Sequence, residues 1–264
     1  MKRLLPILVF FISFSSFDNG NGKNVNNGSF TAGEWFQFRI HYGFLNASYA
    51  TLSLNETVLD GKDVYHVKGY GRTTGLARWF FKVEDNYESY FDKEDIKPYK
   101  FIRKIDEGGY TKDLEIDFDH KNNKAIVTDH KHKKENILET PDNIQDLLSA
   151  FYYLRNHYDI DNIKKGDEIV LDLLFEEDET FKFKLKYLGK VITNTKFGKV
   201  KCLKFRPYVQ SGRIFKEEES LTLWVSDDEN KVPIRIQADL VIGSLKADLD
   251  AFKGLKHQFK VEVN

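Results

Sequence analysis

Apolar and polar residues alternate along most of the chain after residue 33. This period of two is typical of β-strands that face a core on one side and solvent on the other. In TFKFKLKYL, residues 180–188, the phenylalanines, Leu185 and Tyr187 share one face and the lysines share the other. Pairs such as Asp60-Gly61 separate these runs and supply turns. The pattern predicts roughly a dozen antiparallel strands.

One segment, TPDNIQDLLSAFYYLRNHY at residues 140–158, has helical spacing instead. Thr140 is the expected N-cap and Pro141 the expected first helical residue. We predict an amphipathic helix at residues 143–157 that clamps the sheets. Its expected apolar stripe consists of Ile144, Leu147, Leu148 and Phe151.

The stretches on either side of this helix share landmarks in the same order. A glycine followed by an acidic residue stands at positions 33 and 166, an FK motif followed by acidic residues at 81 and 215, and a proline at 98 and 233. We therefore predict two tandem, superposable halves, residues 33–130 and 166–263, within a single β-rich domain at residues 33–264. The fold class is mainly β, with antiparallel curved sheets that form an incomplete barrel or two duplicated β halves.

The acidic stretch WVSDDENKVPIRI, residues 224–236, raises the question of a catalytic site. Asp and Asn supply turns by bonding to local backbone amides, and proline is tolerated at the first residue of a strand. A similar acidic loop precedes Pro98. We therefore interpret Asp227, Asp228 and Glu229 as a hairpin loop.

The N-terminus has the features of an export signal. Lys2 and Arg3 precede the apolar run LLPILVFFI, residues 4–12, and small residues follow it. Nine apolar residues are too few to cross a bilayer, which needs ~20. We predict a signal peptide at residues 1–17, a flexible leader at 18–32, and a periplasmic or otherwise exported protein that is soluble and not transmembrane after cleavage.

Composition and motifs exclude several classes of function. A net charge of −1 provides no field for nucleic acid, and a single cysteine, Cys202, allows no intramolecular disulfide. The four carboxylates of DLEIDFD, residues 113–119, extend over about 20 Å of strand, too far to converge on one calcium ion. His130 and His132 lack a third ligand in the sequence. We expect no metal and no cofactor, and the sequence offers no catalytic residues, although it leaves catalysis open.

Tryptophan positions carry more information about binding. Trp35 and Trp224 fall on the polar face of their strands, so the protein itself or a ligand must cover them. Trp79, Phe80 and Phe81 break the alternation and follow GRTTGLAR, a loop that contains glycine. Such an apolar run is a candidate for the mouth of a hydrophobic pocket.

Three blocks of sequence carry a family resemblance. GEWFQFRIHYGFLNASYATLSL (33–54), LSAFYYLR (148–155) and GRIFKEEESLTLWVSDDENKVPIRIQADLVIGSLKADL (212–249) resemble the exported bacterial proteins called domain of unknown function 3108. That resemblance implies no activity. A weaker likeness links the hairpin LWVSDDENKVPIRI to periplasmic lipoprotein carriers, which implies a curved half-barrel that holds acyl chains.

Two functions remain open from the sequence. The first is a non-enzymatic envelope protein that binds a lipid or a lipoprotein acyl chain in a hydrophobic groove. The alternative is a structural or assembly adaptor that binds another envelope protein. A carrier needs an empty apolar cavity, whereas an adaptor can have a filled core. The expected groove residues are Trp79, Phe80, Phe81, Phe36, Phe38 and Phe215, with Arg72, Arg78 and Arg213 as rim candidates for an anionic head group.

Overall fold

The computed structural model describes residues 28–75, 77–80, 82–157, 162–208, 221–240 and 242–262. The expected signal peptide and the first part of the leader lie outside these residues. The described chain contains two helices, α1 (Ala77–Phe80) and α2 (Leu147–His157). Its strands are β1 (Trp35–Tyr42), β2 (Leu45–Leu59), β3 (Lys62–Thr73), β4 (Val83–Asp92), β5 (Pro98–Glu107), β6 (Tyr110–Asp119), β7 (Lys124–Asp129), β8 (Lys134–Glu139), β9 (Glu168–Leu173), β10 (Phe181–Thr195), β11 (Gly198–Tyr208), β12 (Leu221–Ser226), β13 (Pro233–Asp239) and β14 (Ser244–Lys253).

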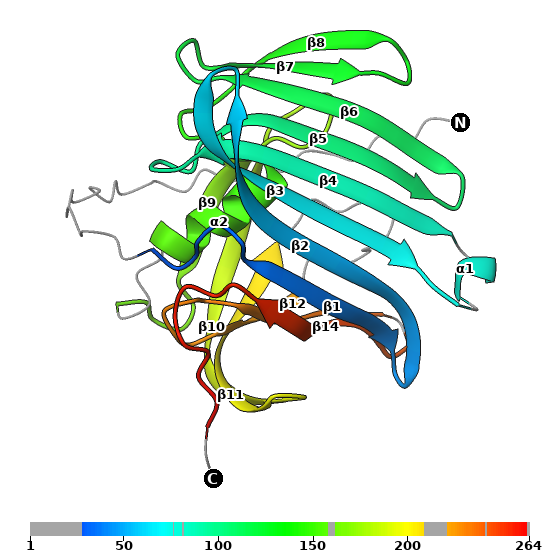
Figure 1. The fold of residues 1–264 in the computed structure, drawn as a ribbon, viewed down its shortest axis with the longest axis vertical. Coiled ribbons are helices and arrows are strands. Elements are labelled where there is room, and N and C mark those ends of the chain that lie inside the picture. Colours follow the sequence, from blue (N-terminus) through cyan, green and yellow to red (C-terminus); the bar gives the residue numbers. More distant parts are fainter. Residues whose placement is uncertain are drawn as a thin grey trace, which may run out of the picture.

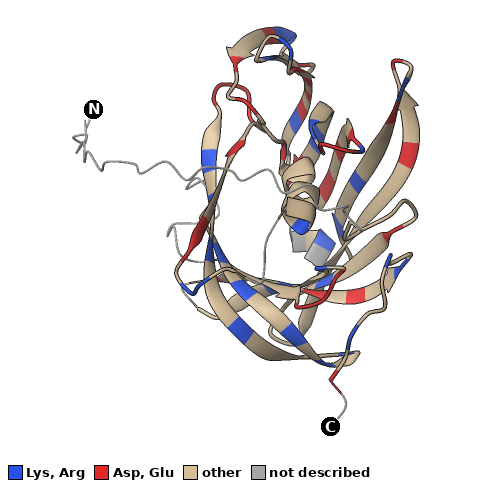
Figure 2. Cartoon of the chain, turned by 90° about the vertical axis from the view of Figure 1, so that its left-hand side faces the viewer, with Lys and Arg blue, Asp and Glu red and all other residues tan. Residues whose placement is uncertain are grey.

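All strands belong to one antiparallel sheet of fourteen strands (Figure 1). Strands β1 to β8 follow one another as neighbours on one side, and β9 to β14 do so on the other. The two sets join where β1 pairs with β14, so β8 and β9 are the free edges. The sheet curls around α2 without closing (Figure 2). This confirms the predicted fold class of a mainly β, curved, incomplete barrel with an amphipathic helix.

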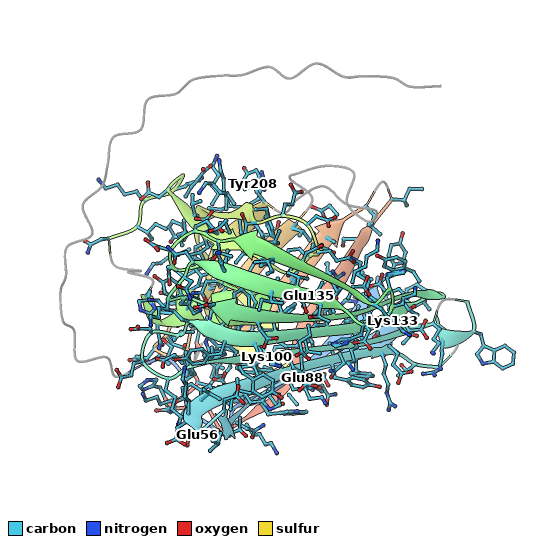
Figure 3. All side chains as sticks on the ribbon, turned by 90° about the horizontal axis from the view of Figure 1, so that it is seen from above. Glu56, Glu88, Lys100, Lys133, Glu135 and Tyr208 are labelled. Atoms are coloured by element: carbon cyan, nitrogen blue, oxygen red, sulfur yellow. The ribbon has the colours of Figure 1, made fainter. Side chains whose placement is uncertain are left out.

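The predicted alternation matches the two faces of the sheet. Charged side chains such as Glu88 on β4 and Lys100 on β5 occupy the outer face (Figure 3), and Lys100 pairs there with Glu115 and Asp117. The inner face carries apolar clusters that pack on α2. Leu148 contacts the clusters around Phe101 and Leu54, Ala150 packs with Leu171, and Leu154 packs with Leu185.

The helix begins later than the sequence suggested. The prediction of Thr140 as N-cap and Pro141 as first helical residue is wrong, because residues 140–146 are not helical and α2 begins at Leu147. Gln145 forms a parallel bridge to Leu173 of β9 and so extends the sheet edge instead. The predicted stripe is also wrong at Leu147, which is 42% exposed. The buried residues of α2 are Ser149, Ala150, Tyr152 and Arg155.

The last residues of the expected leader belong to the fold. Ser29 and Phe30 are each 5% exposed, and Phe30 packs edge-on against Tyr152 of α2 at 4.8 Å between ring centroids. The prediction of a flexible leader is therefore wrong at this point, because Phe30 fills the space between α2 and the sheet.

The tandem halves remain a prediction. Strands β1–β6 before α2 correspond in order to β9–β14 after it. Pro98 begins β5, the fifth strand of the first set, and Pro233 begins β13, the fifth strand of the second. Strands β7 and β8 have no counterpart among the described strands after α2. Both halves are part of the same sheet, so they do not form separate domains. Among the described helices, none is long and apolar enough to cross a membrane.

Candidate functional site

The curled sheet has two different ends. At the first, called the helix end, residues 28–34, the C-terminal part of α2, the β12–β13 loop and the chain after β14 come together. At the second, called the open end, lie the β1–β2 turn, α1 and the β13–β14 turn (Figure 1). Strand β1 runs between them, from Trp35 near the helix end to Tyr42 at the open end.

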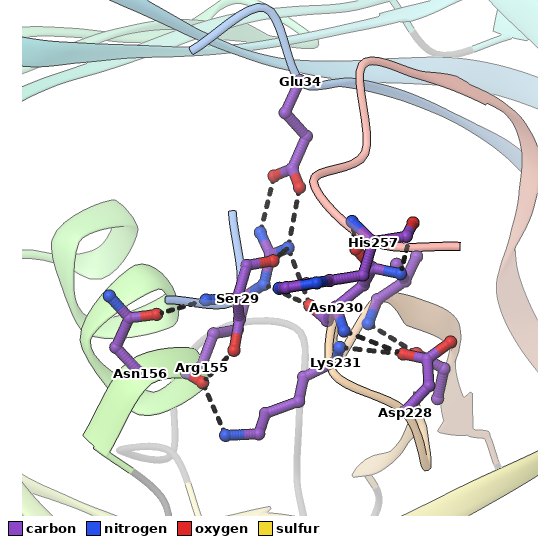
Figure 4. Close-up of polar contacts among 10 residues, drawn as sticks. Ser29, Glu34, Arg155, Asn156, Asp228, Asn230, Lys231 and His257 are labelled. Carbon is purple, nitrogen blue, oxygen red and sulfur yellow. Dashed lines mark hydrogen bonds and ion pairs between the residues drawn. The ribbon is translucent and has the colours of Figure 1, made fainter. Parts of the chain in front are cut away.

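A buried arginine organises the helix end (Figure 4). Arg155 of α2 is 3% exposed, and its guanidinium donates to both carboxylate oxygens of Glu34 at 2.6 and 2.7 Å. It also donates to the backbone oxygens of Asn230 and Ser29. The bidentate pair and the carbonyl contacts satisfy charges that would be costly to bury alone. This cluster is a structural tie between four segments of the chain.

The acidic loop is part of the same tie. Asp228 accepts hydrogen bonds from the Asn230 and Lys231 backbone amides and from the Ser226 hydroxyl, as expected for a turn. The Asn230 side chain donates to the carbonyl of His257 and accepts from its amide. The hairpin-loop interpretation of residues 227–229 is therefore confirmed.

Asp146 anchors the beginning of α2 to the sheet. Its Oδ1 accepts hydrogen bonds from the amides of Leu148 and Ser149 at 2.7 and 2.8 Å, and its Oδ2 accepts one from the Ser89 hydroxyl at 2.6 Å. These are N-cap contacts. Burial raises the pKa of this carboxyl to about 6, although each of these hydrogen bonds acts to lower it.

Toward the open end, the inner face changes character. Leu54, Val67 and Ser89 lie side by side near α2 and are fully buried. Four positions further along the same three strands stand Ala50, Gly71 and Asp85, again side by side. These three residues are partly exposed. We call the inward-facing residues at this level the open wall. Its members are Phe38, Ile40, Ala50, Gly71, Asp85, Ile105, Ile236 and Ala247, and we include Arg103, which lies one row closer to the helix end.

The open wall has an apolar side and a charged side. Ile40, Ala247 and Ile236 form one row across β1, β14 and β13, and Ile236 is 42% exposed. On the other side of Gly71, Asp85 follows on β4 and pairs with the buried Ile105 of β5. Arg103 lies one row closer to the helix end, where it pairs with Tyr87. Small residues in the centre thus separate an apolar surface from a polar one.

Asp85 is the most perturbed group on this wall. Desolvation, with a smaller contribution from the Glu107 charge, raises the pKa of Asp85 to about 6, while Arg103 acts to lower it. Among the described residues, Asp85 Oδ1 and Arg103 Nε are buried without a hydrogen-bond partner. A buried acceptor and a buried donor therefore lie near each other with bonds left to make.

A salt-bridge group beside the wall holds the two free edges of the sheet near each other. Glu176, which follows β9, accepts from Arg103 of β5 at 2.5 Å and pairs with Lys112 of β6. Lys112 also pairs with Glu177 at 3.1 Å, and Asn136 of β8 donates to the Glu177 carbonyl at 3.3 Å. These contacts bridge the seam between β8 and β9. Arg103 is thus held in place while its Nε remains unpaired.

The two described pockets lie elsewhere. One of about 220 Å³ is lined largely by polar and charged residues, including Arg39, Lys196 and Asp248. Another of about 300 Å³ lies between the β1–β2 and β13–β14 turns, beside Tyr42 and Lys246. Neither is lined by any of the described residues that the sequence hypothesis assigned to a lipid groove.

The structure does not gather the predicted groove residues into one place. Phe36 is fully buried in a cluster with Cys202, Val232 and Leu249, and Phe38 borders the same cluster. Trp79 is 90% exposed on α1 at the other end of the molecule. The inward position of Phe38 fits the open wall, whereas the positions of Phe36 and Trp79 do not.

The predicted rim arginines divide in a similar way. Arg72 is exposed, and Arg78 forms an ion pair with Glu84 at 3.6 Å. Phe81, Arg213 and Phe215 lie outside the described residues, as does the side chain of Phe80.

Other residues noted in the sequence have structural surroundings. The Lys204 ammonium lies 5.1 Å from the ring centroid of Trp224, and Lys253 lies 5.8 Å from that of Trp35, so basic side chains cover both rings. Cys202 is fully buried, and desolvation raises the pKa of its thiol to about 11. It is a buried apolar residue with little thiolate.

Asp85 and Arg103 were missed by the sequence analysis, although a signal was present. In VEDNYESYF, Asp85 falls in the same alternation phase as Val83, Tyr87 and Phe91, and all four face inward. Likewise, Arg103 stands between Phe101 and Ile105 in the apolar phase of β5. A charged residue in the apolar phase of a strand indicates a buried charge, which needs a structural or functional partner.

The chain matches one protein family and is similar in fold to a solved structure. The family model described as "Protein of unknown function (DUF3108)" matches residues 37–250. No curated protein matches the chain. A β-barrel-like protein of domain of unknown function DUF1849 from Brucella abortus is similar in structure, with a TM-score of 0.54, 11% identity, and coverage of 84% of this chain and 98% of that one. A DUF1089 family protein from Pseudomonas aeruginosa gives a TM-score of 0.34 at 12% identity, covering 69% and 87%. The first similarity shows the fold alone.

Proposed function

Because the chain belongs to the protein family of unknown function DUF3108, we propose its function from the open wall: it binds an amphipathic ligand, an acyl chain that ends in a small polar head group. The observation that supports this most strongly is the pairing of Ala50 and Gly71 beside Asp85 and near Arg103, each of which has one buried atom, Oδ1 and Nε, without a hydrogen-bond partner among the described residues. The small side chains leave space for a ligand, and the unpaired polar atoms favour a ligand that carries a hydrogen-bond donor and an acceptor.

The room is visible at Gly71. A Cβ placed there would meet only the Cβ of Ala50 within 4 Å, at 3.8 Å. At Gly69, two residues closer to the helix end, a Cβ would instead meet Leu52, Leu148 and Tyr87. The inner face is therefore filled at Gly69 and unfilled at Gly71. An elongated ligand lies along the unfilled part.

The apolar side of the wall accepts the acyl chain. Ile40, Ile236 and Ala247 form its surface, and their alignment across three strands offers a continuous contact. Each buried methylene contributes about 0.8 kcal/mol. A chain of about ten carbons then gives micromolar affinity after the entropy cost of association.

The charged side of the wall accepts the head group. Arg103 Nε can donate and Asp85 Oδ1 can accept, and each unmade bond in a buried site costs about 1–3 kcal/mol. A group with both a donor and an acceptor, such as an amide or a hydroxyl, satisfies both atoms. A simple carboxylate satisfies only the arginine and faces repulsion from Asp85.

The proposed site is tested by titration with 11-(dansylamino)undecanamide, a fluorescent acyl probe whose terminal amide offers both a donor and an acceptor. Saturable binding at micromolar concentration is expected for the native protein. Gly71→Leu, which fills the wall, is expected to weaken binding at least tenfold, whereas Gly71→Ala leaves it nearly unchanged. Tyr70→Leu, on the outer face of the same strand, is the matched control.

Binding that survives Gly71→Leu in a folded variant would overturn the location, and absence of saturable binding would overturn the function. Replacing Arg103 with Met tests the head-group side. It is expected to weaken binding of a fatty acid amide more than binding of an alkane of equal length. Circular dichroism melting of each variant separates loss of the site from loss of the fold.

Export is part of the same proposal. The short apolar run at residues 4–12 supports a mature chain that begins near residues 16–20. Intact-mass spectrometry of protein from the native host tests this. A retained Met1 on protein in the membrane fraction would overturn export by signal cleavage.

A further inference from the structure

We infer that the open end docks on the surface of a phospholipid bilayer, through an apolar tip built from three turns of the sheet. This inference concerns the outside of the molecule and is independent of any ligand on the open wall. The tip consists of Tyr42, Phe44 and Leu45 from the β1–β2 turn, Trp79 from α1, and Leu240, Ile242 and Leu245 from the β13–β14 turn.

These side chains are unusually exposed for their size. Phe44 is 92% exposed, Trp79 90% and Ile242 78%. Single exposed apolar residues are common on soluble proteins, but a group of large ones at the ends of adjacent turns indicates an interaction surface. The tip is therefore the strongest candidate for a contact outside the fold.

The turns of the tip are held next to one another. The Tyr42 hydroxyl donates to the Ile242 carbonyl at 2.9 Å, and Tyr42 pairs in register with both Leu45 and Leu245. The amide of Thr74, just before α1, donates to the Ala47 carbonyl at 3.2 Å. Figure 1 shows α1 and the β1–β2 turn on the same side of the molecule. The apolar side chains thus belong to one surface.

The charge around the tip fits an anionic lipid surface. Residues 42–47 contain no charged side chain. The wider segments 39–48, 72–82 and 239–246 contain one acidic residue against five basic ones. These are Asp239 and Arg39, Arg72, Arg78, Lys82 and Lys246. Glu84 and Asp106 pair with Arg78 and Lys82 and reduce this excess without reversing it.

The shape of the tip favours lipid over a folded partner. Its apolar side chains project from separate turn ends, so a protein partner would need a matching set of pits. A bilayer interface accommodates projecting side chains without such a match. Tryptophan and tyrosine prefer this depth because their rings are apolar and their N–H and O–H groups remain hydrated.

Vesicle sedimentation tests the inference. The chain from residue 18 onward is mixed with sucrose-loaded vesicles of phosphatidylcholine containing one quarter phosphatidylglycerol, and with vesicles of phosphatidylcholine alone. Native protein is expected to sediment with both, and at least threefold more with the anionic vesicles. The Phe44→Asp/Ile242→Asp variant is expected to lose at least tenfold in partitioning.

The matched control is Val58→Asp/Ile137→Asp, because Val58 and Ile137 are 64% and 63% exposed and lie away from the tip. It is expected to bind as the native protein does. Trp79 emission is expected to shift to the blue on binding and to be quenched by brominated lipid, and Trp79→Phe should remove this signal.

Four results would overturn the inference: no sedimentation with either vesicle, equal loss in the tip and control variants, no Trp79 response to lipid, or a dimer in light scattering that the tip variant alone abolishes. The last result would assign the tip to a second copy of the chain. The Gly71→Leu variant distinguishes vesicle binding by the tip from ligand binding on the open wall, because it is expected to lose the ligand and to retain vesicle binding.

Discussion

The two ends of the curled sheet are built from the same strands but differ in how their inner faces are packed. At the helix end, Arg155 is buried and makes bidentate contact with Glu34, and carbonyl oxygens take its remaining donors. At the open wall, Asp85 Oδ1 and Arg103 Nε are buried without a hydrogen-bond partner in the described part of the chain, and so is the Tyr152 hydroxyl at the helix end. Buried polar groups are normally satisfied. The two ends differ in packing instead: side chains fill the helix end, whereas a Cβ at Gly71 would meet only Ala50 within 4 Å, and this is where we propose that a ligand binds.

The change occurs within a few residues of each strand. Along β2 the inner face passes from Leu54 to Ala50, and along β3 from Val67 to Gly71. Leu148 of α2 still lies over Gly69, whereas at Gly71 only Ala50 lies within 4 Å of a Cβ. The packed core and the proposed binding site thus lie on different segments of the same strands.

The largest effect is expected from breaking the helix end. Arg155→Met leaves the Glu34 carboxylate buried and unpaired, which costs about 3–5 kcal/mol in free energy of unfolding. Urea denaturation followed by circular dichroism measures it. Arg72→Met, at an exposed position, is the control and should change stability by less than about 0.5 kcal/mol.

A second substitution tests whether the lost stability comes from the unpaired Glu34 carboxylate. Adding Glu34→Gln to Arg155→Met removes the unpaired charge and should recover part of the lost stability. If the single Arg155 variant unfolds at the native urea midpoint, the helix end is not held by this ion pair.

The next effect distinguishes neighbouring residues of α2. Leu148 packs between two apolar clusters, so Leu148→Ala should lower the free energy of unfolding by about 2–5 kcal/mol. Leu147→Ala should change it by less than about 0.5 kcal/mol, because Leu147 is 42% exposed. Equal losses would show that both leucines contribute to the core.

A pH-dependent effect is expected from Asp146. Because burial raises the pKa of this carboxyl to about 6 in the folded state, its protonated form stabilises the fold. That contribution is present below about pH 4, near the unfolded pKa, and is lost as the pH rises through about 6. Asp146→Asn keeps an oxygen for the helix cap and removes the titration.

The stability of Asp146→Asn relative to the native protein should therefore increase between pH 4 and pH 7, by no more than about 3 kcal/mol. Thermal unfolding at closely spaced pH values measures the difference. A difference that is constant with pH would show that Asp146 has an ordinary pKa in the fold.

The smallest effect is expected at the open wall. Gly71→Ala adds a methyl group where nothing closer than 3.8 Å stands in the way, and it reduces backbone freedom in the unfolded chain. It should stabilise the protein by up to about 1 kcal/mol. A loss of more than about 1 kcal/mol, seen as a lower urea midpoint, would show that the inner face is already packed at Gly71.

Most of the fold could be predicted from the sequence, because alternation depends on local burial, and the strands and turns followed it. The beginning of α2 could not be predicted correctly. Thr140 and Pro141 have the right chemistry for a helix start, but Gln145 bonds to the backbone of β9 and delays it to Leu147. That competing contact is between residues far apart in the sequence.

The candidate site was predicted less well for a related reason. The aromatic run at Trp79 predicts the mouth of a hydrophobic pocket, but an apolar run alone does not show which way its side chains face. Asp85 and Arg103 stood in the apolar phase of their strands and were the better signal. Their proximity depends on the pairing of β4 with β5, and the space between them depends on where α2 stops.

Thiol labelling tests most directly whether the open wall is accessible while the helix end is closed. The native Cys202 is buried, with a thiol pKa raised to about 11, so it should react slowly with a maleimide at pH 7.5. Ala50→Cys at the wall and Ala150→Cys on the buried side of α2 introduce one new thiol each. The thiol at position 50 is expected to react at least a hundredfold faster than the one at position 150, and more slowly when the dansyl probe is bound. Equal, slow labelling at both positions in folded protein would show that the inner face is packed throughout and would contradict an open binding wall.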